Sequence, residues 1–217
     1  MKVSRVSVRR IYNLRQYESL HVEFSVELEE GENPSAIVLK LHQEIWEMEK
    51  TIGLFEEAKN KYDELIDLVE GQRYRSRYSE YVDLFHEYKE KTKKILDEKL
   101  KTLGCLEKID MTNIEALTAC MEEYNIKTLQ DLVGRKEKIK EQIKEIEEHL
   151  KRIEKTEIIY REFKKKFDMD IEATSKLFER QEYSRAREML ERIIEKTEEM
   201  HKMIKECNPE KYKYSWQ

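Results

Sequence analysis

The start of the chain alternates between apolar and polar side chains with a period of two. From position 20 to 28 every second residue is apolar: Leu20, Val22, Phe24, Val26 and Leu28. This period is typical of a strand that buries one face. Positions 3–12 alternate in the same way and place Val6 and Val8 on one face. We therefore predict an antiparallel β-hairpin whose loop lies at residues 13–18.

Beyond the hairpin, apolar residues spaced by three and four predict long helices. Asn33 and Pro34 suit the N-cap and the first position of the first helix, which we expect to end at Gly71. A lone two-stranded hairpin is marginal in water. Its apolar face is therefore expected to lie on this first helix or on strands of a partner subunit. A second helix is predicted over residues 73–103 and ends at Gly104.

The second half of the chain predicts a helical hairpin. Thr112 and Thr128 are expected to start a short helix and then a long one that runs to Phe167. The long helix carries a heptad seam that we predict to form oligomers: Ile139, Ile143, Ile146, Leu150 and Ile153. After a break at residues 168–170, a last helix over 171–206 carries a matching seam, so the two helices should pack antiparallel.

Together these elements predict a mostly helical α+β protein. An N-terminal antiparallel β-hairpin packs on long helices, and a C-terminal antiparallel coiled-coil hairpin follows. We expect a first domain at residues 1–104 and a helical oligomerisation region at 105–217, with a homodimer or homotetramer as the assembly. The aromatic tail, residues 208–217, is expected to be an exposed docking segment or to be frayed.

Composition supports long helices with charged outer faces. Charged residues make up 41% of the 217-residue chain, which contains only five Gly and two Pro. Abundant Lys, Glu and Ile suit a thermophile that relies on surface ion pairs. Cys105, Cys120 and Cys207 are widely spaced, as in a reducing cytoplasm. Because no apolar run approaches the roughly 18 residues of a membrane span, we expect a soluble cytoplasmic protein without membrane contact.

The sequence lacks the common motifs of catalysis and cofactor binding. Its five scattered glycines form no nucleotide-binding loop. Its histidines form no ligand-spaced pair, and there is no Cys or His cluster for zinc. No serine sits in a nucleophile elbow, and the many paired carboxylates are typical of solvated helix faces. We therefore expect no enzyme, no cofactor and no metal.

The net charge of −5 conceals two basic strips. Residues 1–17 contain five Lys or Arg and no acid, whereas residues 18–72 contain fifteen acids and four bases. Residues 73–101 turn basic again, with nine Lys or Arg and six acids. An anionic partner would therefore meet two local strips on an otherwise acidic protein.

The first strip is the leading candidate for nucleic-acid binding. Its residues are Arg5, Arg9, Arg10, Tyr12, Arg15 and Tyr17. Proteins that hold single-stranded nucleic acid combine basic groups along the phosphates with aromatic rings on which bases stack. Equally, Arg5 and Arg9 could form cross-strand ion pairs with Glu23 and Glu27. Arg10 lies on the opposite face, where it must reach the edge of the hairpin or a partner.

The second strip opens with an alternation of basic and aromatic residues. Arg73, Tyr74, Arg75 and Arg77 are candidates to line a binding groove. The competing interpretation places arginines on the solvent side of a core seam formed by Tyr81, Phe85 and Tyr88. Trp46, on the flank of the first helix, is interpreted as a core or interface residue.

The segments Val3–Arg10 and Tyr17–Phe24 carry a resemblance to a known family. This basic, aromatic strand pair, followed by helices and a coiled coil, resembles the ThermoDBP-related archaeal single-stranded-DNA-binding proteins over residues 1–104. The resemblance implies an N-terminal nucleic-acid-binding domain and a C-terminal part that forms oligomers. The acidic first helix departs from this pattern and lowers the expected affinity, because non-specific binding depends on phosphate neutralisation.

The sequence thus supports two hypotheses. In the first, an oligomer binds single-stranded DNA or RNA without sequence preference, through Arg and Lys contacts to phosphates and Tyr stacking. In the second, the protein is a coiled-coil scaffold that assembles with itself and has no nucleic-acid affinity. A helical binder that regulates an enzyme or acts as a chaperone is a further alternative.

Overall fold

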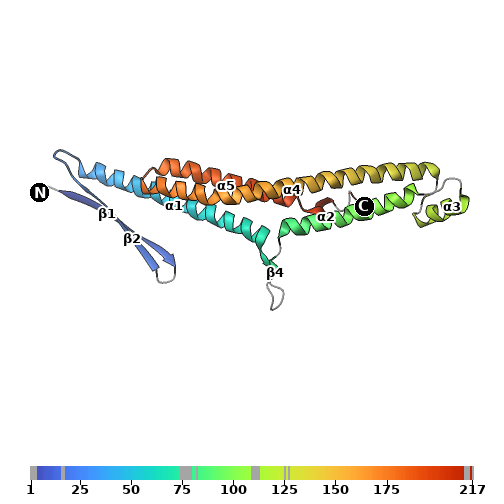
Figure 1. Cartoon of the computed structure of the whole chain (residues 1–217). Helices are drawn as coiled ribbons and strands as arrows, with labels where there is room; N and C mark the ends of the chain where they lie inside the picture. The colour runs from blue at the N-terminus through green and yellow to red at the C-terminus, as the bar shows by residue number, and fades with distance from the viewer. Residues whose placement is uncertain are drawn as a thin grey trace. The chain divides into compact units, whose positions relative to one another are not determined.

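The structure is a computed structural model that describes residues 4–15, 18–73, 80–81, 83–108, 113–124, 126, 128–212 and 216. Its elements, in chain order, are β1 (Arg5–Arg15), β2 (Glu18–Glu27), α1 (Pro34–Glu70), β3 (Gln72–Arg73), β4 (Glu80–Tyr81), α2 (Leu84–Glu107), α3 (Ile114–Glu123), α4 (Leu129–Glu179), α5 (Tyr183–Glu206) and the 3-10 helix η1 (Pro209–Tyr212) (Figure 1). The prediction of a mostly helical α+β fold with an N-terminal antiparallel hairpin is confirmed.

The chain forms two compact units, and each unit combines two separate segments. The first comprises Met1–Lys59 and Met169–Ile194, and the second comprises Asn60–Asp168 and Glu195–Gln217. Position 104, the expected domain boundary, lies inside α2 in the second unit. The predicted helix end at Gly104 is wrong, because α2 continues to Glu107. One glycine lowers helix stability by only about 1 kcal/mol and does not end a helix that packs well.

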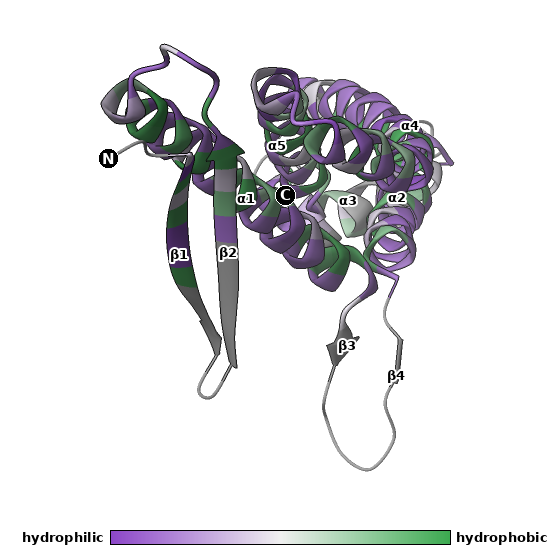
Figure 2. Cartoon of the chain, turned by 90° about the vertical axis from the view of Figure 1, so that its left-hand side faces the viewer, coloured by the Kyte–Doolittle hydropathy of each residue, from purple (hydrophilic) through white to green (hydrophobic). Residues whose placement is uncertain are grey.

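The β1–β2 ribbon confirms the predicted alternation. Val6 pairs with Val26 and Val8 with Phe24 on one face, and all four side chains are partly buried. Figure 2 shows the alternation of apolar and polar residues along β1. The strands are longer than predicted, because the pairing continues to Arg15 opposite Glu18.

The apolar face of the ribbon lies towards α1, which was one of the two predicted alternatives. Arg10 shares this face, and its guanidinium Nε lies 3.3 Å from a carboxylate oxygen of Glu49 on α1. Both strands lie beside α1 in Figure 2. The cover is incomplete, since none of the ribbon side chains that the structure describes is fully buried.

The start and end of α1 confirm the predicted signals. Asn33 caps the helix, since its Oδ1 accepts a hydrogen bond from the backbone N–H of Ser35 at 3.0 Å. The helix ends at Glu70, just before Gly71. In the first unit, α1 buries one stripe, which includes Leu41, Ile45 and Met48.

The predicted break at residues 168–170 is wrong, because α4 runs through it to Glu179. An aspartate costs a helix only a fraction of a kcal/mol, about 0.7 or less, and the helix buries Phe167 and Thr174 on either side of this segment. The last helix therefore starts at Tyr183 instead of 171. The end of α4 and the start of α5 form the predicted antiparallel helical hairpin.

The start of α2 also differs from the prediction. Residues 72–73 and 80–81 pair as a short antiparallel ladder, and α2 begins only at Leu84. Asp83 is its N-cap, accepting from the backbone N–H groups of Phe85 at 3.0 Å and His86 at 3.4 Å. Phe85 and Tyr88 are buried, as the core interpretation predicted.

Two apolar clusters form the core of the second unit. The first draws on α1, α2, α4 and α5 and contains Leu65, Val69, Phe85, Tyr88, Ile153, Tyr160, Met200, Ile204 and Cys207. The second contains Leu106, Ile126, Leu132, Ile139 and Ile143. Of the predicted oligomerisation residues, Ile146 is also buried and Leu150 is partly buried. The heptad seam therefore packs within its own chain, and its role in oligomers stays a prediction.

The described residues of the tail, 208–212 and 216, correct the prediction that the tail is exposed or frayed. Pro209 and Trp216 are buried, and Trp216 is only 3% exposed. The ring centroid of Trp216 lies 5.2 Å from that of His149 on α4, and the Tyr212 ring lies 4.7 Å from the same imidazole. Burial of these aromatic side chains stabilises the docked tail.

Thr128 is the N-cap of α4, as predicted, whereas the predicted cap of α3 lies outside the described residues. Thr128 Oγ1 accepts from the backbone N–H of Asp131 at 3.1 Å, and the N–H of Thr128 donates back to Asp131 Oδ2 at 3.0 Å. This reciprocal pair is a capping box with Asp in the place of Glu. The predicted cap of α3 is Thr112, which is not among the residues that the structure describes.

Candidate nucleic-acid interface

Strand β1 concentrates positive charge on the exposed ribbon. It carries four arginines and no acid over its eleven residues. Arg5 and Arg9 share the polar face, and a rise of about 3.3 Å per residue places their Cα atoms about 13 Å apart. Arg10 projects from the opposite face. Strand β2, by contrast, carries three glutamates, so the ribbon as a whole has little net charge.

Arg9 forms the cross-strand ion pair that the alternation predicted. Its guanidinium donates to Glu23 Oε2 at 2.9 Å. This hydrogen bond, followed by the charge of Arg9, lowers the pKa of Glu23 below its ordinary value. The Arg9 side chain is nevertheless 65% exposed. A pair so open to water is weak, so an incoming anion can compete for the guanidinium.

Arg5 makes a different contact from the predicted one. It stands opposite Glu27 in the ladder, but its guanidinium donates to Ser25 Oγ at 2.7 Å. Ser25 projects from the same face as Glu27, two positions away. Arg5 therefore keeps its charge beside a neutral hydroxyl partner.

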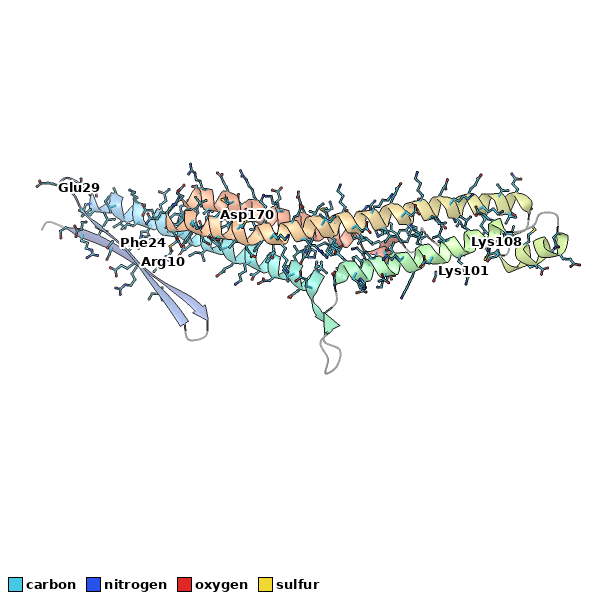
Figure 3. All side chains as sticks on the ribbon, in the orientation of Figure 1. Arg10, Phe24, Glu29, Lys101, Lys108 and Asp170 are labelled. Carbon is cyan, nitrogen blue, oxygen red and sulfur yellow. The ribbon has the colours of Figure 1, made fainter. Side chains whose placement is uncertain are left out.

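Arg10, which is labelled on the ribbon in Figure 3, pairs with Glu49 on α1. Its side chain is still 51% exposed. The sequence contained a signal for this partner, because the segment facing the ribbon is strongly acidic. An arginine on the face that packs against such a helix is expected to find a carboxylate.

The remaining predicted residues are described in part or not at all. The backbones of Tyr12 and Arg15 lie on β1, opposite Leu20 and Glu18. In the second unit, the backbone of Arg73 pairs with that of Glu80. The other four residues lie outside the part of the chain that the structure describes: Tyr17, Tyr74, Arg75 and Arg77.

Trp46 lies in the first unit, where the core alternative of its prediction is wrong and the interface alternative stays a prediction. Its side chain is 50% exposed, and the Lys50 ammonium lies 3.5 Å from the centroid of its ring. The pair lines a pocket of about 720 Å³, to which α5 contributes Arg187. Arg187 is ion-paired with Glu47. The spacing of Trp46 and Lys50, one helical turn apart, was the signal that sequence reasoning overlooked.

A partly buried polar network in the second unit joins α1 to α4. Glu70 accepts from the Tyr160 hydroxyl at 3.0 Å and from the Lys164 ammonium at 2.8 and 2.7 Å. Burial raises the pKa of Glu70, but the bonds from Lys164 and Tyr160 outweigh it and the pKa falls below its usual value. Burial and the bond to Glu70 raise the pKa of Tyr160.

This network lines a pocket of about 710 Å³ whose acidic and basic groups nearly balance. A phenol with a raised pKa is a poor general base near neutral pH. The ion pair of Lys164 with Glu70 likewise ties up both groups. We therefore interpret the residues of this pocket as a structural contact between α1 and α4. Over the described ranges, no group of three or more His, Cys, Asp or Glu side chains is placed to hold a metal ion.

No protein-family model, curated protein or solved structure matches this chain. Among the helices of the described part of the chain, none has the length and apolar character that a membrane crossing requires.

Proposed function

We propose that the protein binds single-stranded nucleic acid without sequence preference, through the arginines of β1. The observation that carries this proposal is a strand with four arginines and no acid, in which Arg5, Arg9 and Arg10 are exposed. Arg9 and Arg10 remain more than half exposed even in their ion pairs. Phosphates take the place of the carboxylates of Glu23 and Glu49, and Tyr12 provides a surface for base stacking.

The carboxylate partners set the expected strength of this binding. Each phosphate contact displaces an existing ion pair, so part of its electrostatic gain is offset. We therefore expect affinity in about the micromolar range at low salt, with a strong loss as salt rises. Single strands suit this ribbon better than duplex, because their bases are free to stack on aromatic side chains.

The alternative function is self-assembly through the ribbon. It is favoured by the incomplete cover of the apolar face, where Val6, Val8 and Phe24 are only partly buried. A second copy that covers these side chains would stabilise both ribbons, since a two-stranded sheet gains stability from added strands or packing.

A titration of fluorescein-labelled oligo-dT, followed by anisotropy at low salt, tests the proposal. The variant Arg9→Ala/Arg10→Ala/Tyr12→Ala should bind about tenfold or more weakly than the intact protein, because it loses two phosphate contacts and one stacking surface. Arg185→Ala/Arg192→Ala is the matched control. It removes two exposed arginines from the same unit, and its affinity should not change.

Two results would contradict the proposal. One is the absence of saturable binding by the intact chain at low salt. The other is an equal loss of affinity in the triple variant and in the control. Light scattering on the same samples decides the alternative, because a subunit count above one without oligo-dT binding would leave assembly as the function.

A further inference from the structure

The docked C-terminal tail and α2 enclose a pocket in the second unit. Helix η1 lies beside α2 in Figure 1. The pocket has a volume of about 490 Å³, which lies in the range of roughly 300–1,000 Å³ that is common for small-molecule sites. Its apolar wall is formed by Ile95 from α2 and by Pro209 and Trp216 from the tail.

The apolar wall is held in place by a set of ring contacts. The Trp216 ring stacks on that of Tyr212 at 5.3 Å and packs edge-on against His149 at 5.2 Å. The Arg152 guanidinium donates to the Tyr212 hydroxyl at 3.2 Å. Because these contacts fix Trp216 before any ligand arrives, the wall costs little to organise on binding.

The rim of the pocket is basic. Lys91, Lys94 and Lys99 oppose Glu98 and Glu210, which leaves a net charge of +1. Lys91 has acidic neighbours, since its ammonium lies 3.0 Å from Glu87 and 4.0 Å from Glu210. Lys94 is exposed and, within the described residues, has no carboxylate within 4.0 Å. It is therefore the cation at this rim that is available to an anion.

Lys99 adds to the positive potential. Its ammonium donates to Gln142 Oε1 at 3.0 Å, a neutral partner. Burial lowers the pKa of Lys99, and the positive charges of Lys138 and Arg135 lower it further. Of these three cations only Lys99 lines this pocket, so an anion bound at the rim would offset part of the repulsion that Lys99 experiences.

We propose that this pocket binds a small amphiphilic carboxylate, such as a medium-chain fatty acid. The apolar body lies against Ile95, Pro209 and Trp216, and the carboxylate is held at the rim by Lys94, with Lys99 contributing to the field. The inference is independent of the proposed nucleic-acid function, because it uses none of the residues of β1.

The test uses Trp216 as its reporter. The chain has two tryptophans, and Trp46→Phe removes the exposed one, so the remaining emission comes from the pocket wall. Decanoate should change this emission saturably, with one ligand per chain. Decyltrimethylammonium, which has a matched chain and the opposite charge, should not.

Two charge-reversal variants on α2 distinguish binding in the pocket from binding to the general protein surface. Lys94→Glu should weaken decanoate binding by about tenfold or more, because it removes one charged hydrogen bond and adds a repulsion. Lys93→Glu is the matched control, since Lys93 is exposed on the same helix but does not line the pocket. Isothermal titration calorimetry with the unsubstituted chain repeats the measurement without the Trp46 change.

The proposal is overturned if the cation and the anion bind equally well. It is also overturned if Lys93→Glu and Lys94→Glu lose the same affinity, or if neither fluorescence nor calorimetry detects saturable binding. Binding of decanoate that only Lys94→Glu weakens is the supporting result.

Discussion

His149 is the residue that attaches the tail to α4. Its Nε2 lies 3.1 Å from the backbone carbonyl of Cys207, in a buried setting against the rings of Tyr212 and Trp216. The contact needs a proton on Nε2, so a neutral ring already satisfies it. A second proton, on Nδ1, would place a charge in this site.

Acidification should therefore destabilise the docked tail. Burial, supported by the charge of Arg152, lowers the pKa of His149 below its usual 6.5, although the bond to Cys207 opposes the shift. Because the unfolded chain binds this proton more tightly than the folded chain, stability is intact above about pH 6.5 and falls as the pH drops towards the folded pKa. Thermal unfolding followed by circular dichroism should show a lower Tm at about pH 5 than at about pH 7.5.

His149→Gln keeps a side-chain donor and removes the titration. Its Tm should depend less on pH than that of the unsubstituted chain. The pH dependence that remains comes in part from His201, whose pKa is also lowered by burial and by Lys205. His86→Gln, at an exposed position on α2, is the control. An identical pH dependence in all three proteins would show that His149 does not hold the tail.

At the residue scale, the sequence revealed contacts that follow from local geometry. The pairing of Arg9 with Glu23 follows from the alternation of two adjacent strands. The pairing of Arg10 with Glu49 depends on which side of α1 meets the ribbon, and the periodicity of either element alone does not determine this. The docking of Trp216 on His149 joins residues 67 positions apart and left no local signal.

At the scale of the element, the C-terminal end of α4 lacks the glycine that is usual at such a helix terminus. The N–H of Gln181 donates to the carbonyl of Phe178 at 2.9 Å, and that of Glu182 donates to Leu177 at 3.0 Å. These two bonds form a Schellman motif, which needs a left-handed residue at its centre. Gln181 adopts that conformation with a φ of 62°, where glycine is the usual choice.

Gln181→Gly should therefore stabilise the protein. Removing the Cβ relieves the left-handed strain, and we expect the free energy of unfolding to rise by about 1 kcal/mol. Ala173→Gly is the matched control, because Ala173 is exposed inside the same helix. That change should lower the free energy of unfolding by about 1 kcal/mol. Urea denaturation followed by circular dichroism measures both, and two shifts of the same sign would contradict the account.

Helix starts were predictable where a capping side chain marks them. Asn33 and Thr128 are caps whose side chains bond to backbone two or three residues away, so a short sequence window contains the whole signal. The acidic segment at 168–170 looked like a break because tertiary burial on either side was not visible in its composition. The start of α2 was placed too early because the aromatic spacing of 73–88 also fits a helix.

At the scale of the whole molecule, the two units could not be predicted from the sequence. Each unit pairs an early segment with a late one, so that residues 1–59 share a unit with 169–194. An amphipathic stripe shows that a helix has a partner but does not identify the partner. For the same reason the heptad seam did not reveal that Ile146 and Ile153 are buried within the chain, and its role between subunits stays a prediction.

The central claim is that the arginines of β1 contact phosphates, and the salt dependence of oligo-dT binding tests it most directly. The logarithm of the affinity should fall linearly with the logarithm of the salt concentration, with a slope of about −0.7 per phosphate contact on a single strand. Arg9→Ala should make the slope shallower by about one such contact. A slope that is the same in Arg9→Ala and in the unsubstituted protein would contradict the claim.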